Sequence, residues 1–179
     1  GAFMKKLIPQ KVIEQKIYMI RGHKVMLSTY LAKLYGVRVK ALIQAVKRNI
    51  ERFPDDFMFQ LTWDEAEPSR SQFVTLKKGQ NIKYLPYAFT EQGVAMLSSV
   101  LRSKRAIQVN ITIMRAFVKL RLILSTHKEL AQKLNELEKR VEKHDVAIRG
   151  IFEAIRQLME PPPAKERIIT GFRPPDKVK

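Results

Sequence analysis

Basic and polar side chains recur at helical spacing between residues 38 and 48. Lys40, Gln44 and Lys47 follow one another at intervals of four and three, and Arg48 adjoins them, so all four share one face of a predicted helix. Arg and Gln side chains hydrogen-bond base edges in pairs, and Lys side chains contact phosphates. Arg38 stands where this helix begins and is placed for a contact with the nucleic-acid backbone. The pattern predicts a surface that binds double-stranded DNA.

Two short predicted helices position this surface. The first spans residues 29–35, is capped by Ser28 or Thr29, and ends at Gly36, a residue suited to a left-handed helix end. The second begins near Val39 and packs inward through an apolar stripe of Leu42, Val46, Ile50 and Phe53. This is helix-turn-helix spacing, with the basic face on the second, recognition helix. The alternative is a helix pair within an all-helical core, whose basic face is only solvated.

The charge balance favours a polyanionic partner. The chain has 34 Lys and Arg against 17 Asp and Glu, a net charge of +17, which is typical of nucleic-acid binding. The excess is uneven, because residues 1–125 hold 22 basic and 8 acidic side chains, whereas residues 126–179 hold 12 and 9. The absence of cysteine excludes disulfides and thiolate zinc sites. With no membrane-length apolar run and no signal-peptide core, we expect a cytoplasmic protein with no membrane partner.

The region before the C-terminal helix is predicted to be an α+β domain, a compact mixed fold with small β hairpins. We expect it to open with a hairpin of residues 16–20 and 24–27, broken by Arg21 and Gly22. Further strands are predicted over residues 57–61, 72–76 and 82–87, with a short helix over 63–67. The hairpin tip after residue 76 carries weaker candidate phosphate contacts, namely Lys77, Lys78 and Lys83. The alternative is a polar tip that is merely exposed.

Two more helices are predicted after this hairpin. Thr90 can cap a helix that runs to about residue 101, and Ser103 can cap the next one. In the second of these helices we expect the stripe of Ile107, Ile111, Met114 and Val118 to be buried.

Residues 120–160 follow a heptad repeat without interruption, which predicts one long helix that self-associates. Opposite charges at the flanking positions Lys133 and Glu138, and Arg140 and Asp145, favour a parallel arrangement, as a dimer or a trimer. The predicted oligomerisation residues are Leu130, Leu134, Leu137, Val141, Ile148, Ile151, Ile155 and Leu158. The alternative is a helix folded back on its own domain, which we disfavour because nearly six heptads exceed what so small a domain can cover.

Prolines 161–163 end that helix. The Pro-rich tail that follows, residues 161–179, contains a small apolar cluster at Ile168, Ile169 and Phe172, which either docks on a partner or lacks a fixed structure.

The sequence offers little for catalysis, so we expect no enzyme activity and no cofactor. Its dense acidic groups, at Asp55 and Asp56 and at residues 64–67, stand where a turn or a helix start explains them. Two of the three histidines, His127 and His144, fall on the heptad seam, and no helical His pair is spaced for metal binding. We therefore expect no metal site.

Several runs together resemble a known family. They are LAKLYGV, AVKRNIERFPDDFMFQLT, SQFVT, YLPYAFTEQGVAMLSSVL and SKRAIQVNITIMRAFVKLR. Over residues 8–121 the chain is similar to the ORF-six N-terminal domain of phage antirepressors, which is related to KilA-N domains. The resemblance implies a compact phage or prophage domain, inferred to bind DNA and often joined to a C-terminal module. The hairpin departs from the family pattern, because KKGQNIKY replaces a more glycine-rich turn.

Motif residues of the second helix can also be structural. We expect Arg52 to lock the helix to the following turn by pairing with Asp55 or Asp56.

The sequence therefore predicts a KilA-N-like DNA-binding domain over residues 8–119, a coiled-coil helix over 120–160 and the tail. We interpret the chain as a phage or prophage regulator that binds duplex DNA and oligomerises. The alternative is an antirepressor that binds a repressor protein through the coiled coil and the apolar cluster of the tail, without binding DNA itself.

Overall fold

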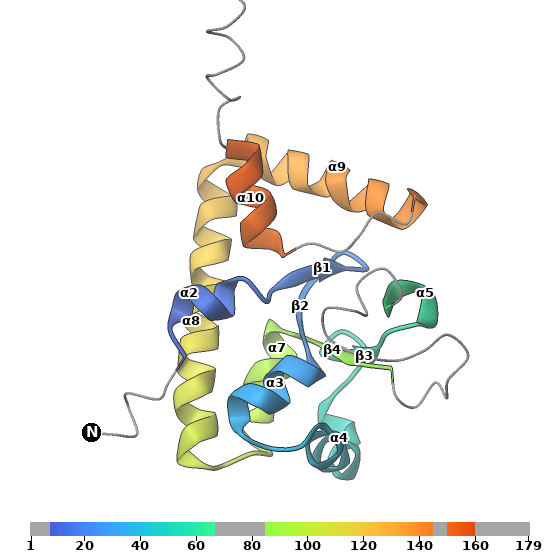
Figure 1. Cartoon of the computed structure of the whole chain (residues 1–179), viewed down its shortest axis with the longest axis vertical. Helices are drawn as coiled ribbons and strands as arrows, with labels where there is room; N and C mark the ends of the chain where they lie inside the picture. The colour runs from blue at the N-terminus through green and yellow to red at the C-terminus, as the bar shows by residue number, and fades with distance from the viewer. Residues whose placement is uncertain (1–7, 67–84, 145–149, 160–179) are drawn as a thin grey trace, which may run out of the picture.

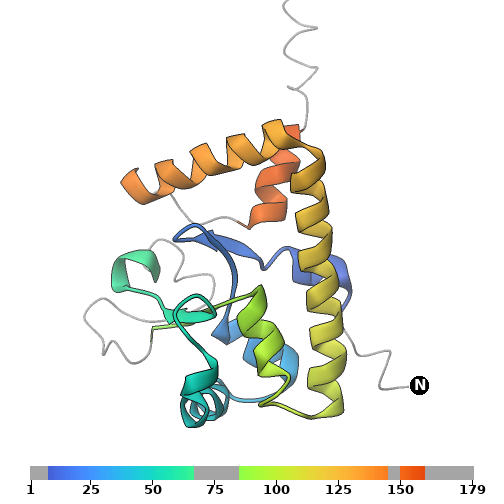
Figure 2. The same cartoon turned by 180° about the vertical axis from the view of Figure 1, so that it is seen from behind.

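The computed structural model describes residues 8–66, 85–144 and 150–159. It confirms the predicted α+β class, because helices surround a four-stranded antiparallel sheet of order β1-β2-β4-β3 (Figure 1). The elements that position the basic surface are the sheet and the helices α3 (Ser28–Tyr35), α4 (Val39–Arg48), α7 (Glu91–Leu97) and α8 (Lys104–Thr126). The helices α8, α9 (Lys128–His144) and α10 (Ile151–Met159) lie along one edge and across the top of the molecule, on the left in Figure 1 and on the right in Figure 2.

The predicted first hairpin is present. Strands β1 (Tyr18–Ile20) and β2 (His23–Leu27) pair antiparallel, with Ile20 opposite His23. The two turn residues between them, Arg21 and Gly22, have φ values of 56° and 78°, as a type I′ turn requires. The domain does not open with this hairpin, however. The short helix α2 (Gln10–Glu14) precedes it and packs against α8, because Ile13 is buried there and Lys119 of α8 pairs with Glu14 at 3.1 Å.

The rest of the sheet comes from β3 (Met58–Gln60) and β4 (Tyr87–Thr90). β3 confirms the predicted strand at residues 57–61, and α5 (Trp63–Ala66) confirms the short helix after it. β4 lies later than the strand predicted at residues 82–87, since its buried centre is Ala88 and Phe89. It pairs with both β2 and β3. The strand predicted at residues 72–76 lies outside the described residues.

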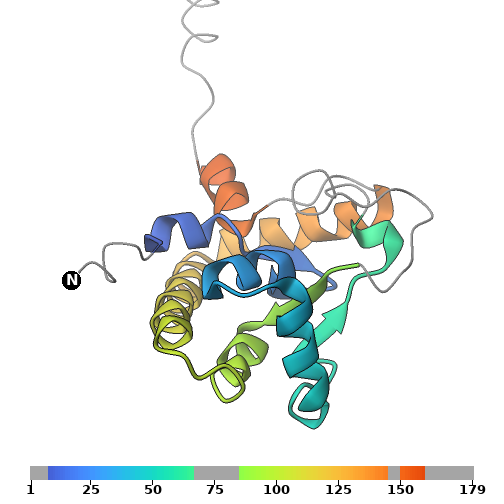
Figure 3. The ribbon, with the colours of Figure 1, turned by 60° about the horizontal axis from the view of Figure 1, so that its bottom comes forward.

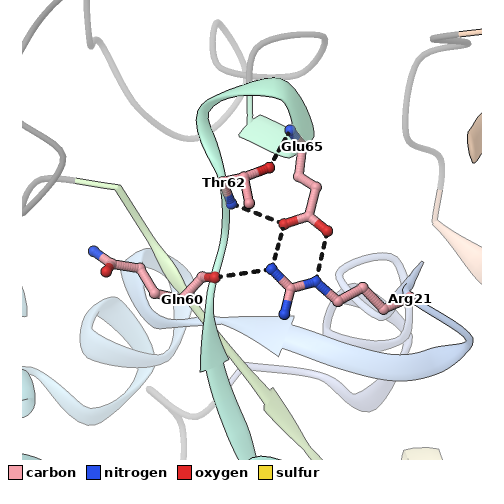
Figure 4. Close-up of polar contacts among 4 residues, drawn as sticks. All are labelled: Arg21, Gln60, Thr62 and Glu65. Carbon is pink, nitrogen blue, oxygen red and sulfur yellow. Dashed lines mark hydrogen bonds and ion pairs between the residues drawn. The ribbon is translucent and has the colours of Figure 1, made fainter.

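A polar cluster fixes the hairpin turn to the connection between β3 and α5 (Figure 4). Thr62 and Glu65 form a capping box, in which each backbone N–H donates to the other side chain. Arg21 donates from two nitrogens to the Glu65 carboxylate, at 2.7 and 2.9 Å, and from one of them to the carbonyl of Gln60. Partial burial acts to raise the pKa of Glu65, but the hydrogen bonds from Arg21 and Thr62 outweigh it and lower that pKa.

Both predicted caps around the next helices are confirmed. Thr90 caps α7 (Glu91–Leu97) by accepting from the backbone N–H of Gly93, and Ser103 caps α8 (Lys104–Thr126) by accepting from Ala106. α7 is shorter than predicted, because residues 98–100 form turns rather than a continuing helix.

Buried polar groups join α3 (Ser28–Tyr35), α7 and α8. The Tyr35 hydroxyl donates to Oδ1 of Asn110 at 2.6 Å, and Nδ2 of Asn110 donates to Ser98 Oγ and to the carbonyl of Val94. Burial raises the pKa of Tyr35, so the phenol stays neutral and keeps its proton for this bond. These bonds satisfy groups whose burial would otherwise be costly.

The face of α8 that was predicted to be buried is exposed. Ile107, Ile111 and Val118 are 46%, 41% and 51% exposed. The buried face consists of Ala106, Val109, Asn110, Ile113, Ala116, Phe117 and Leu120. The prediction was wrong because α8 carries two apolar faces, and periodicity alone does not say which of them meets the domain.

The single helix predicted over residues 120–160 is divided. α8 ends at Thr126, where His127 leaves helical geometry with φ −119° and ψ 81°. α9 (Lys128–His144) and α10 (Ile151–Met159) then fold back (Figures 1 and 2). The backbone N–H of Ile151 donates to the carbonyl of Ile17 at 2.8 Å, so α10 is tied to the start of β1. The prediction of one continuous helix is therefore wrong. The structure shows the alternative that we disfavoured, in which the C-terminal helices fold back on their own domain.

The seam residues of the heptad repeat account for this fold-back. Leu130, Leu134, Ile151 and Ile155 are buried in the same apolar cluster as the domain core. Leu137 is partly buried against it and Leu158 is exposed. The side chain of Val141, the residue Ile148 and the tail lie outside what the structure describes. Self-association through this repeat stays a prediction.

Candidate nucleic-acid interface

The first of the two predicted helices is α3. Leu31, Ala32 and Leu34 are buried as predicted, and Gly36 ends the helix in a left-handed conformation with φ 75° and ψ 30°. The predicted caps were wrong, because the helix begins at Ser28 and no side chain caps it. The Ser28 hydroxyl accepts instead from the backbone N–H of Tyr87, at 3.0 Å. That bond anchors α3 to β4.

The second helix is α4 (Val39–Arg48), which begins after a three-residue connection, residues 36–38. Leu42 and Val46 are buried against the domain, as predicted. Ile50 departs from the predicted stripe and is 52% exposed. The reason is that α4 ends at Arg48, where the Asn49 side chain donates to the carbonyl of Ala45, and a 3-10 turn, η1 (Ile50–Arg52), follows.

Phe53 returns to the core after η1. It is buried and packs edge-on against Phe89 of β4, with 6.0 Å between ring centroids. The helix pair is thus held at both ends, by Ser28 at its start and by Phe53 beyond its end.

The outer face of α4 carries the predicted recognition residues. Lys40, Gln44, Lys47 and Arg48 are all exposed, and so is Arg38 at the N-cap position. At 100° per residue the four side chains of the helix itself lie opposite Leu42 and Val46, whereas Arg38 precedes the helix with extended backbone. α4 contains no acidic residue. The structure therefore brings four of the predicted contacts together on one side of α4, with Arg38 at the end where the helix begins, and we call these five residues the α4 face.

Further basic residues lie at the same end of the molecule as the α4 face. The sequence had not assigned them to DNA binding. Arg105 of α8 donates to the carbonyl of Leu34 at 2.7 Å, beside the turn between α3 and α4. Arg52 of η1 donates to the hydroxyl of Ser99, whose carbonyl accepts from Arg102. Figure 3 shows this end of the molecule, with α3, α4 and the start of α8 together. Lys104 is exposed in the same stretch as Arg102.

These contacts also correct one expectation. Arg52 was predicted to pair with Asp55 or Asp56, but its guanidinium bonds Ser99 instead, because η1 packs beside the end of α7. The signal that could have found Arg102 and Lys104 was their charge alone. The bond between Arg52 and Ser99, which brings η1 to the segment that contains Arg102, joins residues 47 positions apart in the sequence.

The hairpin tip predicted after residue 76 is the remaining part of the expected DNA surface. Lys77, Lys78 and Lys83 lie outside the described residues, so their role as phosphate contacts stays a prediction.

Comparison with known families assigns a family to part of this chain. Residues 15–100 match the family model of the ORF6N domain. The chain carries an ORF6N domain. The matched region holds the sheet, the α3–α4 pair and α7, whereas α2, α8, α9 and α10 lie outside the residues matched. ORF6N membership indicates a phage-type regulatory protein of the antirepressor kind. The comparisons with curated proteins and with solved structures found no match.

The described residues also bear on metal binding and on membrane crossing. Over the residues that the structure describes, no group of three or more His, Asp and Glu side chains is arranged to hold a metal ion. Within the same residues no helix combines the length and apolar character that crossing a membrane needs.

Proposed function

We propose that this protein is a phage or prophage regulator that binds duplex DNA by inserting α4 into the major groove. The observation that carries the proposal is the α4 face, where Lys40, Gln44, Lys47 and Arg48 project away from a helix side that is anchored by Leu42 and Val46. A ten-residue helix is about 15 Å long, and the major groove, about 12 Å wide, admits a helix with its side chains.

The residues of the α4 face have different expected roles. Arg48 offers paired N–H donors, and Gln44 offers one donor and one acceptor group, so both can bond base edges and would carry sequence preference. Lys40, Lys47 and Arg38 would neutralise phosphates and orient the helix. Arg102, on the connection from α7 to α8, and Lys104, the first residue of α8, are exposed, and we propose that they contact the DNA backbone outside the groove.

The charge balance supports this function. A chain of net charge +17 is attracted to any polyanion, and phosphate contacts make the affinity fall steeply with salt. Sequence-specific binding would add the base contacts of Gln44 and Arg48 to this general attraction.

Self-association would place two α4 helices on one duplex. Symmetric docking requires half-sites about 34 Å apart, which is one helical turn of DNA. If the C-terminal heptads form the dimer, α9 and α10 must first leave the positions in which Leu134 and Ile155 are buried within the chain. We therefore propose that DNA binding belongs to the ORF6N domain itself and does not depend on the C-terminal helices.

The test is binding of a fluorescent mixed-sequence duplex, followed by anisotropy. One variant replaces Lys40, Lys47 and Arg48 with Ala. The matched control replaces three exposed lysines of α9, Lys128, Lys133 and Lys139, with Ala. Both variants therefore lose three positive charges. We expect the α4 variant to lose at least about tenfold in affinity and the control much less. Equal losses in the two variants would mean that only net charge matters and that α4 is not the DNA surface.

A further inference from the structure

Helix α8 presents a second apolar face that the domain does not use. Ile107, Ile111, Val118 and Leu122 are 46%, 41%, 51% and 64% exposed, and Met114 between them is half-buried. Their intervals of three and four place them on one side of the helix, opposite the buried side that includes Ile113 and Leu120. A helix that is apolar on both sides is typically buried on both sides.

This face forms one wall of a shallow groove of about 610 Å³. The other wall is α7, which contributes Ala95 and Ser98. Figure 2 shows α7 and α8 side by side. From Ile107 to Leu122 the stripe is about 22 Å long, which corresponds to four turns of a docked helix. Apolar grooves of this kind bind amphipathic helices through residues spaced at i, i+3, i+4 and i+7.

The charges along the groove select the partner. α8 contains five basic residues and no acidic residue. Arg115 and Lys119 line the groove beside the apolar stripe. Lys119 already pairs with Glu14, at 3.1 Å, whereas Arg115 is exposed and has no ion-pair partner among the described residues. An occupant of this groove gains by placing a carboxylate opposite Arg115.

We propose that the groove between α7 and α8 is a docking site for an amphipathic helix of another protein, with acidic residues beside its apolar stripe. A second copy of this chain fits less well, because α8 paired with α8 would bring only like charges along the two stripes. The site goes beyond the proposed DNA binding, since it lies on α7 and α8 and not on the α4 face.

The test uses two labelled helical peptides of about sixteen residues, a length that spans the stripe. Both carry leucines at helical spacing, and one has Glu and the other Lys beside the leucines. Full-length protein is titrated into each peptide and anisotropy is recorded. The groove variant carries Ile111→Ser and Val118→Ser, and its control is Val12→Ser, which changes an exposed apolar residue of α2 outside the groove lining.

We expect the Glu peptide to bind at least about tenfold tighter than the Lys peptide. The groove variant should weaken that binding about tenfold or more, because two apolar anchors are lost, and Val12→Ser should leave it unchanged. Arg115→Glu should reduce affinity for the Glu peptide about fivefold and raise it for the Lys peptide. A change of preference cannot arise from misfolding.

Three results would overturn the docking site. These are equal affinity for the two peptides, no binding of the Glu peptide at concentrations that saturate DNA binding, and binding that the groove variant does not weaken. A fourth contradicting result would come from light scattering, if the native chain were a dimer and the groove variant a monomer. The groove would then be occupied by a second copy of this chain. Duplex DNA binding is measured on the same samples, so that failure of the docking site is separable from failure of the proposed function.

Discussion

Substitution of Leu134 tests whether the C-terminal helices fold onto their own domain. It is 3% exposed on α9 and belongs to the same apolar cluster as the domain core. Leu134→Ala removes buried carbon atoms and leaves a cavity, which costs about 3 kcal/mol in the free energy of unfolding. For a chain of 179 residues that loss lowers Tm by about 6–12 °C. The control Leu122→Ala changes a leucine that is 64% exposed and should shift Tm by less than about 2 °C.

The assay is thermal unfolding followed by circular dichroism at two protein concentrations that differ about tenfold. If α9 folds back as the structure shows, the native Tm is independent of concentration and Leu134→Ala lowers it equally at both. A coiled coil would instead make Tm rise with concentration. A concentration-dependent Tm, or a Leu134→Ala variant as stable as Leu122→Ala, would refute the intramolecular packing of α9.

Three further predictions concern the domain itself. Tyr35→Phe should lower the free energy of unfolding by about 1–2 kcal/mol in urea titrations, because a buried asparagine of α8 loses its donor. Gly93→Ala should prevent soluble expression or cost several kcal/mol, since the added Cβ would lie 2.0 Å from the carbonyl oxygen of Phe57; a fully stable variant would contradict the packing of α7. The lowered pKa of Glu65 means that its ion pair with Arg21 contributes stability above the ordinary pKa of a glutamate, and that this contribution disappears as the pH falls through the lowered value. Glu65→Gln should therefore reduce the loss of unfolding free energy at acid pH by less than about 1 kcal/mol, because the pair is partly exposed. An unchanged dependence of stability on pH would show that the pair does not contribute to it.

Local signals in the sequence predicted local structure well. Arg21 and Gly22 identified a two-residue hairpin, Gly36 identified the end of α3, and the hydroxyls of Thr90 and Ser103 identified two helix starts. In each case the cause lies within a few residues of the effect, as a positive φ or a capping hydrogen bond. The outer face of α4 was predictable for the same reason, since spacing alone places Lys40 opposite Leu42.

Features that depend on a distant partner were not predictable. The heptad repeat correctly located apolar residues such as Leu130 and Leu134, but a repeat does not say whether its seam meets a second chain or its own domain. α8 gave the same ambiguity, because either of its two apolar faces could have been the buried one. Arg105 lies near the α3–α4 turn only through its bond to the carbonyl of Leu34, and the end of α7 lies near η1 only through the bond between Arg52 and Ser99.

The salt dependence of DNA affinity tests the central proposal most directly. Anisotropy titrations between about 50 and 200 mM salt give the slope of log K against log salt for the native chain and for the α4 variant without Lys40, Lys47 and Arg48. If these three side chains contact phosphates or bases, the variant binds more weakly and its slope is smaller by up to about 2.7. The α9 control should keep the native slope. No binding by the native chain at about 50 mM salt, or an unchanged slope in the α4 variant, would contradict DNA recognition by α4.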